Sequence, residues 1–326
     1  MNLTILQQYS VRLHLANMLT FVVIEKTQRN LRELSLKKNI MASETKGYNL
    51  TTLVNNFELS YDDIGEGEIP IIFLHGFPFD KTMWLGQLDF LQSGYRVISC
   101  DLRGFGASED EKSYLSMDLF ANDLIAFMNK LKIEKAILCG LSMGGYIALN
   151  ACEMFPERFE ALILCDTQCI ADSPEVKTKR YETIEEIKAN GPATFNEGFI
   201  KNVFHEDSIS EKNEIVEAVR LVVYSNSRHI ITAGLIALAE RSETCSTLAR
   251  STTPTLIIVG REDKVTPLSQ SESMHRSIKG SLLRIIDHAG HLSNLEQPFE
   301  FNKHLYDFLV TLKDSDVPLA LEVEEY

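Results

Sequence analysis

Short apolar runs that alternate with longer, helix-periodic segments are the feature that most constrains how this chain can fold. Continuous apolar runs occupy residues 69–74, 94–100, 135–139, 161–165 and 254–259, and residues 57–62 alternate between apolar and polar side chains. Helix-periodic segments occupy residues 118–131, 143–155 and 299–312. Strands that are apolar on both faces and are separated by helices predict an α/β fold, with a mostly parallel central sheet flanked by helices.

One long segment interrupts this alternation. Residues 167–251 contain no convincing strand and are rich in charge, while 216–223 and 230–241 are more apolar. We expect this segment to be an inserted helical cap whose apolar parts face a ligand cavity. The sequence thus predicts a core formed by residues 50–166 and 252–313, the cap between them, and an acidic tail at 314–326.

The first 49 residues are expected to be an N-terminal extension, disordered or helical. The apolar run at 19–24 is far shorter than the ~20 residues that a membrane helix requires. No small-residue cleavage site follows it, as one would in a secretory signal. Met41 opens a polar stretch that leads into the first expected strand, so it is a candidate for the true initiator.

Composition excludes some classes of function. The 326 residues carry 32 Lys and Arg against 46 Asp and Glu, for a net charge of −14, and such a surface repels nucleic acid and anionic membranes. The six cysteines include no C-x-x-C pair and no cluster with zinc-ligand spacing. Several end apolar runs, which favours buried thiols in a reducing compartment over disulfides and predicts a cytoplasmic protein.

A candidate nucleophile lies between the run at 135–139 and the helix that begins near Met143. The motif is Gly140-Leu-Ser142-Met-Gly144, and Gly145 follows it. A nucleophile elbow needs this arrangement, because the serine occupies a strained strand-to-helix turn and the small neighbours let other backbone pack close. The helix N-terminus also favours a developing oxyanion. The alternative interpretation is an ordinary glycine-rich turn.

The partners of such a serine are expected to follow it in the order acid, then histidine. His291 lies in a loop before the last helix and is the predicted base, with His288 as the alternative. Asp263 follows the run at 254–259 and is the predicted acid that orients the imidazole. Glu262 and Asp166 stay open as rival acids. Each of these residues could instead be an ordinary loop or turn residue.

The segment after the run at 69–74 supplies the third element. It reads His75-Gly76-Phe77-Pro, and the glycine lets the backbone turn so that the next amide can point toward the serine. The backbone amides of Phe77 and Met143 are therefore the predicted oxyanion hole. His75 precedes the serine and is interpreted as a structural hydrogen-bonding residue.

Together these motifs resemble the α/β-hydrolase superfamily over residues 50–313. They occur in that family's order, as His75-Gly-Phe-Pro, Asp101-Leu-Arg-Gly-Phe-Gly-Ala-Ser108, Gly140–Gly145, Gly260–Pro267 and Gly290-His291. The resemblance implies that the segment at 101–108 is a structural turn, so Arg103 is assigned no chemistry. Within the superfamily the chain looks most like bacterial carboxylesterases and 3-oxoadipate enol-lactonase-like enzymes. The N-terminal extension departs from that pattern.

The expected activity is hydrolysis of a small carboxylic ester or lactone through an acyl-serine, with no metal and no organic cofactor. The resemblance leaves three alternatives: a cofactor-free haloperoxidase or perhydrolase, a C–C bond hydrolase, and a ligand receptor that uses this fold. An anionic lactone would need a basic cap residue near the serine. The candidates are Lys177, Arg180, Arg220 and Arg228, each of which could equally be a solvated surface charge. The sequence specifies neither the substrate nor the oligomeric state.

Overall fold

A computed structural model describes residues 46–110 and 114–314, so the predicted acidic tail and all but the end of the N-terminal extension lie outside the described residues. The core is one sheet of eight strands. The strands are β1 (Gly47–Val54), β2 (Phe57–Ile64), β3 (Ile71–Leu74), β4 (Val97–Cys100), β5 (Ala136–Leu141), β6 (Phe159–Cys165), β7 (Thr255–Gly260) and β8 (Leu282–Ile286).

The sheet confirms the predicted α/β class. Its strand order is β1-β2-β4-β3-β5-β6-β7-β8, and every pair from β4 to β8 is parallel. The pairs β1–β2 and β2–β4 are antiparallel. Strand β1 was missed by the sequence analysis. It is a half-exposed edge strand with a register irregularity after Gly47 and a positive φ at Asn49, so it lacks a regular apolar alternation.

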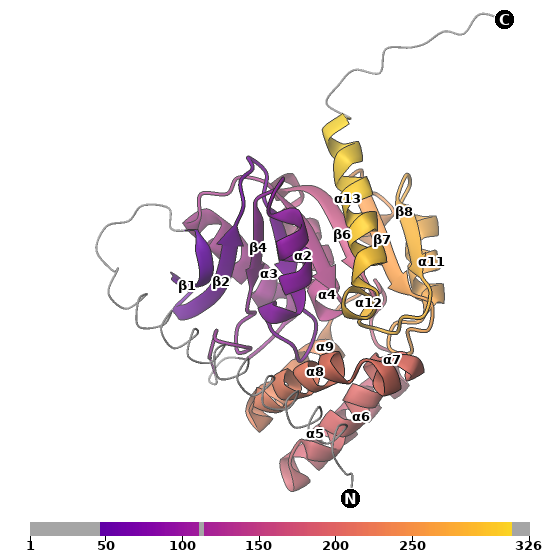
Figure 1. Ribbon diagram of the computed structural model, residues 1–326. Coiled ribbons are helices and arrows are strands. Elements are labelled where there is room, and N and C mark those ends of the chain that lie inside the picture. Colours follow the sequence, from indigo (N-terminus) through magenta and orange to yellow (C-terminus); the bar gives the residue numbers. More distant parts are fainter. Residues whose placement is uncertain (1–45, 111–113, 315–326) are drawn as a thin grey trace, which may run out of the picture. The chain divides into compact units, whose positions relative to one another are not determined.

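Helices cover both faces of the sheet (Figure 1). The helices of the core are α2 (Leu85–Leu91), α3 (Met117–Lys130), α4 (Met143–Met154), α11 (Leu268–Ser277), α12 (Ser293–Glu296) and α13 (Pro298–Asp314), with short 3-10 helices η1 (Lys81–Trp84) and η2 (Pro156–Arg158). Successive residues of β3 divide between two apolar clusters. Ile72 and Leu74 pack with residues of α3 and α4, whereas Ile71 and Phe73 pack with residues of α2 and α13.

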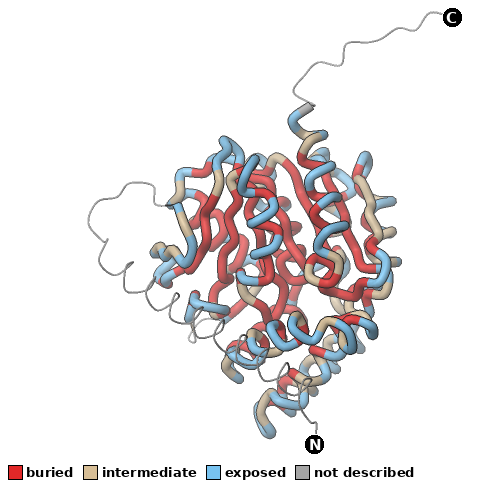
Figure 2. The backbone as a smooth tube through the Cα atoms, viewed as in Figure 1, coloured by how far each residue is buried: buried red, intermediate tan, exposed pale blue. Residues whose placement is uncertain are grey.

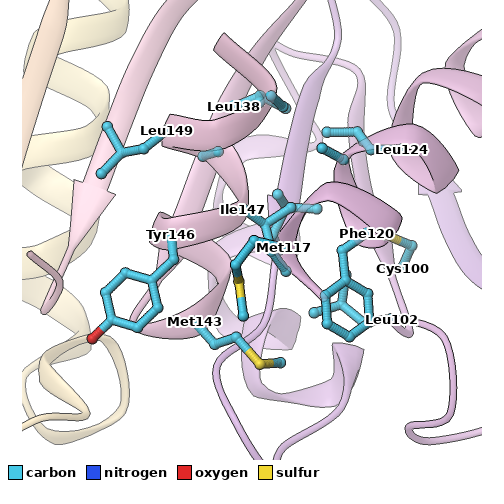
Figure 3. Packing of buried hydrophobic residues seen from close by; sticks show 14 of the residues in the cluster. Cys100, Leu102, Met117, Phe120, Leu124, Leu138, Met143, Tyr146, Ile147 and Leu149 are labelled. Carbon is cyan, nitrogen blue, oxygen red and sulfur yellow. The ribbon is translucent and has the colours of Figure 1, made fainter. Parts of the chain in front are cut away.

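The central strands are buried and the outer faces of these helices are exposed (Figure 2). On the α3–α4 side, Met143, Tyr146 and Ile147 of α4 lie next to Met117 and Phe120 of α3 (Figure 3). The start of α4 is therefore fixed by the core. This matters for function because α4 begins directly after Ser142.

Between β6 and β7 the chain contains only helices. They are α5 (Pro174–Asn190), α6 (Ala193–Val203), α7 (Glu206–Glu211), α8 (Asn213–Ser225), α9 (Arg228–Glu240) and α10 (Cys245–Leu248), which we call the cap. Figure 1 shows α5 to α9 gathered at one end of the sheet. Within the described ranges, no single helix is long and apolar enough to cross a membrane. Among the described helices, only α8 and α9 together reach that length and composition, and they are bent by 96°.

One sequence prediction about the cysteines is wrong. Cys169 and Cys245 form a disulfide across 76 residues of sequence, whereas their pattern in the sequence predicted buried thiols and no disulfide. The other four cysteines are free and buried, in agreement with it. The pairing escaped a search for local cysteine spacing because it depends on where the two ends of the cap meet. Cys169 follows β6 at the entry to the cap, and Cys245 precedes β7 at its exit.

Candidate active site

Ser142 lies in the turn between β5 and α4. Its φ of 54° and ψ of −115° are unusual for a residue with a side chain, and such backbone conformations cost about 1–3 kcal/mol. The backbone of Ser142 is held on both sides. Its amide donates to the Cys165 carbonyl over 2.9 Å, and its carbonyl accepts the Thr167 hydroxyl over 2.8 Å. The serine side chain is thereby presented at the carboxyl end of the sheet.

Glycines on either side of Ser142 allow this turn. A Cβ atom on Gly144 would lie 2.2 Å from the carbonyl oxygen of Leu74, and one on Gly140 would lie 2.3 Å from the carbonyl oxygen of Gly144. No larger residue fits at either position without moving the backbone. The first turn of α4 consequently packs directly against the end of β3, which is where His75 to Phe77 begin.

The amides of Phe77 and Met143 are the predicted oxyanion hole. Within the described ranges neither amide donates a hydrogen bond to another group of the chain, and Met143 is the first residue of its helix. Amides at a helix N-terminus have no intrahelical acceptor and are suited to bind an anion. The close packing of Gly144 against Leu74 brings the two segments that carry these amides together.

His75 is structural, in agreement with its interpretation from sequence. The ring is fully buried, the Leu102 amide donates to its Nε2 over 3.0 Å, and its Nδ1 donates to the Gly76 carbonyl over 2.8 Å. Both ring nitrogens are therefore occupied. Burial also lowers the pKa of His75, which keeps the ring neutral.

Asp263 and His291 are in direct contact. His291 Nδ1 lies 2.8 Å from Asp263 Oδ2, and both side chains are buried. Because the carboxylate accepts a hydrogen bond from the N–H group at Nδ1, the neutral ring is held in the tautomer that leaves Nε2 without a proton. Nε2 is then free to accept one. The His291 amide donates to the Val203 carbonyl over 2.8 Å, which ties this loop to the end of α6.

The loop after β7 holds the Asp263 carboxylate from the other side. The amides of Val265 and Thr266 donate to Oδ1 over 2.7 and 3.0 Å, and the Thr266 hydroxyl donates to Oδ2 over 2.7 Å. Burial alone would raise the pKa of Asp263. The charge of His291 and the hydrogen bonds from His291 and Thr266 outweigh burial and lower it below the usual range. Asp263 therefore stays ionised beside the imidazole.

The Ser142 hydroxyl makes no hydrogen bond to any group in the described ranges, so it is not bonded to His291 in this state. Bonds between nucleophile and base are often long in free enzymes and tighten when substrate binds. Ser142 follows β5, Asp263 follows β7 and His291 follows β8. These strands are parallel neighbours through β6, so all three residues lie at the same edge of the sheet.

The rival residues have other contacts. The Glu262 carboxylate accepts the Ala289 amide over 3.2 Å. Asp166 accepts the Gly260 amide over 2.8 Å and also accepts the Ser293 hydroxyl, and burial followed by the charge of Asp263 raises its pKa well above the usual range. His288 is exposed and lies beside His205 of the cap. None of the three contacts His291 through a hydrogen bond.

Two threonines that the sequence analysis did not single out support the site. Thr266 bonds Asp263 through its hydroxyl and its amide, and Thr167 bonds the carbonyl of Ser142. Thr266 lies inside the segment Gly260–Pro267 that the resemblance had already marked, so only its role was missed. Thr167 follows Asp166 in a turn that carries no recognisable motif, and only the fold brings it beneath the serine.

Aromatic side chains join the cap to the predicted oxyanion segment. Phe77 lies 6.3 Å, between ring centroids, from both Phe195 and Phe199 of α6, and 6.0 Å from Phe105. Phe79 lies 5.7 Å from Phe199. Helix α9 also approaches Phe77, because a Cβ atom on Gly234 of α9 would lie 2.5 Å from the Phe77 ring. The surroundings of Phe77 are therefore apolar and are built from both the core and the cap.

The basic cap residues considered for an anionic substrate are mostly engaged elsewhere. Arg180 pairs with Asp172 over 2.6 Å, Arg220 pairs with Glu197 and Glu217, and Arg228 donates to the Lys188 carbonyl over 3.0 Å. Lys177 lies on α5. Arg103 of the core, to which no chemistry was assigned, pairs with Asp110 and Asp123 over 2.6 Å each.

Two cavities lie where the cap meets the core. One, of about 280 Å³, is apolar and lies between α8 and the segment around η1, with Phe79, Met83, Val219 and Val222 in its walls. Ala218, Val219 and Val222 of α8 line this cavity, whereas Ser142, Asp263 and His291 do not. The other, of about 110 Å³, is more polar and lies beside Cys169.

One group of side chains in the described ranges could hold a metal ion. It consists of His205, Asp207 and His288, whose ligand atoms lie within 4.8 Å of one another. The group is separate from Asp263 and His291. Because 81 residues separate Asp207 from His288, spacing in the sequence could not reveal it.

Comparisons with known proteins match the chain to one fold family and to several enzymes. A family model described as "alpha/beta hydrolase fold" matches residues 69–183 and 174–298. A 3-oxoadipate enol-lactonase 2 from Acinetobacter baylyi is 30% identical over 253 residues, covering 77% of this chain and 93% of that protein. A putative non-heme chloroperoxidase from Synechocystis sp. is 32% identical over 271 residues, covering 77% and 95%. The structure of a thermophilic esterase from Thermogutta terrifontis superposes with a TM-score of 0.76 at 35% identity, covering 83% of this chain and 99% of that one.

Proposed function

The chain belongs to the α/β-hydrolase family, and we propose that it is a serine hydrolase which cleaves a small carboxylic ester or lactone. The observation that carries this proposal is Ser142 in its strained turn between β5 and α4, at the same edge of the sheet as the Asp263–His291 pair. A serine held this way presents its hydroxyl at the carboxyl end of the sheet, where an imidazole from the same edge can accept its proton.

In the first half of the reaction, Ser142 Oγ attacks the carbonyl carbon of the substrate and its proton passes to His291 Nε2. Asp263 stabilises the imidazolium that forms. The negative charge that develops on the carbonyl oxygen is bound by the amides of Phe77 and Met143. Each such donor contributes about 3–4 kcal/mol to the stability of the transition state. The intermediate collapses, His291 returns the proton to the leaving oxygen, and an acyl-serine remains.

In the second half, His291 Nε2 takes a proton from a water molecule, which attacks the acyl carbon. The same amides bind the second oxyanion, and collapse releases the carboxylic acid and the free Ser142 hydroxyl. In a lactone the leaving oxygen stays attached to the acyl group, so the product is a single hydroxy acid. No step requires a metal or an organic cofactor.

The surroundings of Phe77 support an apolar acyl group. Rings from α6 enclose this residue, whose amide belongs to the proposed oxyanion hole. Of the four basic cap residues, Arg180 and Arg220 are neutralised by carboxylates. We therefore favour a neutral ester or lactone over an anionic one.

The decisive experiment compares hydrolysis of p-nitrophenyl acetate and butyrate by the wild type and by Ser142→Ala. We expect the wild type to turn over and the variant to lose at least about 10³-fold in kcat, as loss of a nucleophile does. Ser271→Ala is the matched control, because Ser271 is also buried but lies on α11 and has no hydrogen-bond partner in the described ranges. Equal activity of wild type and Ser142→Ala would refute the proposal.

A second candidate is halogenation or perhydrolysis by the same residues, because a relative named as a putative non-heme chloroperoxidase is 32% identical. Bromide- and peroxide-dependent bromination of a phenol in acetate buffer, lost in Ser142→Ala, would favour it. A C–C bond hydrolase is tested with a ring-cleavage diketone, and a receptor would bind a ligand tightly with almost no turnover.

The proposed partner is a small molecule and not a nucleic acid, given the net charge of −14. We propose a cytoplasmic location, because four of the cysteines are free, buried thiols. The Cys169–Cys245 disulfide argues in the other direction. Fractionation of the producing cells, followed by thiol labelling of the protein, tests the location directly.

A further inference from the structure

The cap and the loop that carries His291 each contribute nitrogen or oxygen ligands to one surface cluster. His205 is the N-cap residue of α7, Asp207 lies in the first turn of that helix, and His288 lies three residues before His291. Their ligand atoms are all within 4.8 Å of one another, and the rings of His205 and His288 meet edge to face with centroids 5.9 Å apart. The active-site chemistry proposed above uses none of them.

We propose that His205, Asp207 and His288 bind one divalent transition-metal ion, such as zinc. Two imidazoles and a carboxylate are the ligand types that zinc prefers, and three protein ligands leave a position for water. The His205 side chain is 12% exposed and that of Asp207 is 61% exposed, so an ion can reach the site from solvent. Zinc–ligand bonds of about 2.0–2.2 Å require the three atoms to approach only modestly from their present spacing.

Hydrogen bonds between the side chains of Glu296 and Gln297 and the backbone hold the two ligand-bearing segments in place before any ion binds. The Glu296 carboxylate accepts the His205 amide through Oε2 and the Gly290 amide through Oε1, each over 2.7 Å. The Gln297 side chain donates to the His288 carbonyl over 3.1 Å. Because cap and loop are already joined, the ion need only order the side chains. Ligands held in advance bind with a smaller loss of conformational entropy.

Local bonds leave the ligand atoms available. The Asp207 amide donates to His205 Nδ1 over 3.2 Å, a long bond that caps α7, and the Asp207 carboxylate lies 3.7 Å from the same nitrogen. If Nε2 of His205 coordinates the ion, Nδ1 still faces the Asp207 carboxylate. If Nδ1 coordinates the ion, the metal bond replaces the weak hydrogen bond from the Asp207 amide. Neither route leaves a buried group without a partner.

A bound ion would join α7 to the loop of His291. That loop already contacts the cap through the bond from the His291 amide to the Val203 carbonyl. We therefore expect zinc to hold the cap more firmly next to the base, and to change the rate of ester hydrolysis without taking part in it. The metal site stands whether or not the proposed hydrolase activity is correct, because binding is measured without substrate.

The test uses the full chain, stripped of metal, and titrates it with zinc in a calorimeter and with cobalt in a spectrophotometer. Cobalt reports the coordination of nitrogen and oxygen ligands through its visible absorption. Two variants preserve the backbone while removing a ligand. His288→Asn suits the positive φ of 55° at this position, and His205→Asn keeps a residue type that caps helices well. His229→Asn is the control, since His229 is an exposed histidine on α9 outside the cluster.

We expect one zinc per chain for the wild type and His229→Asn, and at least about tenfold weaker binding for either ligand variant. Loss of an outer-shell partner alone weakens metal sites by roughly 10–100-fold, so loss of a ligand should do no less. Equal melting temperatures without metal would show that the variants are folded. Zinc binding that is absent from the wild type, or unchanged in His288→Asn, would overturn the proposal.

Discussion

The Asp263 carboxylate determines which nitrogen of His291 carries the proton. Its Oδ2 atom accepts from His291 Nδ1, while its Oδ1 atom is held by two backbone amides of the same loop. Replacing Asp263 by Asn would offer an N–H group to Nδ1 and place the ring proton on Nε2, which then cannot accept a proton from Ser142. We expect Asp263→Asn to lower kcat/KM for a p-nitrophenyl ester by about 10³–10⁴-fold with little change in fold.

The neighbouring Glu262→Gln variant is the control for this prediction. Glu262 accepts only the Ala289 amide, and a glutamine oxygen can replace that acceptor. Its expected effect on the free energy of unfolding is within about 0.5 kcal/mol. If Asp263→Asn and Glu262→Gln lost activity to the same small degree, Asp263 would not be the residue that orients the base.

Asp166 predicts a pH dependence of stability. Burial, followed by the charge of Asp263, raises its pKa well above the ordinary value of about 3.9. Between that value and the raised one, the folded state binds more protons than the unfolded state, so the free energy of unfolding falls as pH rises. Asp166→Asn removes this decrease in the free energy of unfolding, because asparagine does not titrate. The asparagine oxygen can still accept the hydrogen bond from the Gly260 amide. The variant should thus gain stability relative to the wild type on going from pH 4.5 to pH 8.

Urea denaturation of both proteins across this range measures the difference. The gap between the free energies of unfolding of the two proteins should widen as the pH rises, because only the wild type loses the bound proton. Parallel curves for the wild type and Asp166→Asn would show that the pKa of Asp166 is the same in both states.

Individual site residues could be predicted from the sequence where they belong to a local motif. Ser142 was found because small residues flank it between an apolar strand and a helix. The contact of Asp263 with His291 could be anticipated only through the order of elements, since 28 residues separate them. Thr167 was missed because it meets Ser142 only through the pairing of β5 with β6. The cluster of His205 with His288 was missed because it forms only where the cap meets the loop after β8.

Among the elements, α9 is one that packs closely against the proposed oxyanion segment. A Cβ atom on Gly234 of α9 would lie 2.5 Å from the ring of Phe77, whereas one on Gly198 of α6 would meet nothing within 4 Å. Both glycines lie inside cap helices, where alanine is intrinsically better by about 1 kcal/mol. We expect Gly198→Ala to stabilise the protein and Gly234→Ala to destabilise it by about 1–3 kcal/mol through overpacking.

The two variants also differ in their expected activity. Gly234→Ala displaces Phe77, whose amide is proposed to bind the oxyanion, so its kcat should fall together with its stability. Gly198→Ala should retain wild-type kcat. Thermal unfolding and ester kinetics measure both quantities, and a Gly234→Ala variant as stable and active as Gly198→Ala would show that Phe77 is not confined by α9.

The elements themselves were largely predictable. Strands β3 to β7 are buried on both faces and appear in the sequence as continuous apolar runs. Strand β1 was not predicted, because an edge strand pairs on one side only and need not be apolar. The helical content between β6 and β7 was predictable from the absence of strand-like runs, but the faces of these helices that contact the core were not.

At the scale of the whole molecule, the two ends of the cap are joined to each other as well as to the sheet. The Cys169–Cys245 disulfide links them, and the Thr244 amide donates to the Cys169 carbonyl over 2.9 Å. Beside it, Arg241 pairs with Asp172 over 2.8 Å, and both side chains are almost fully buried. Removing one partner from a buried ion pair is strongly destabilising, so this pair resists separation of the two ends.

The disulfide therefore stabilises the protein more than it shapes the site. A loop of this length restricts the unfolded chain by up to about 4 kcal/mol in the chain-entropy description. Dithiothreitol, which reduces the bond to two thiols and is itself oxidised to a disulfide, should lower the melting temperature of the wild type. Since about 1 kcal/mol changes the melting temperature of a protein of this size by about 2–4 °C, a fall of roughly 5–15 °C is expected.

The double variant Cys169→Ser/Cys245→Ser provides the control for reduction. It should melt at the temperature of the reduced wild type with or without dithiothreitol, because the four remaining cysteines are free and buried. Its ester hydrolysis at 25 °C should match that of the wild type, since the Arg241–Asp172 pair still closes the ends of the cap. If the variant kept its stability but lost activity, the disulfide would instead act by positioning the cap over Ser142.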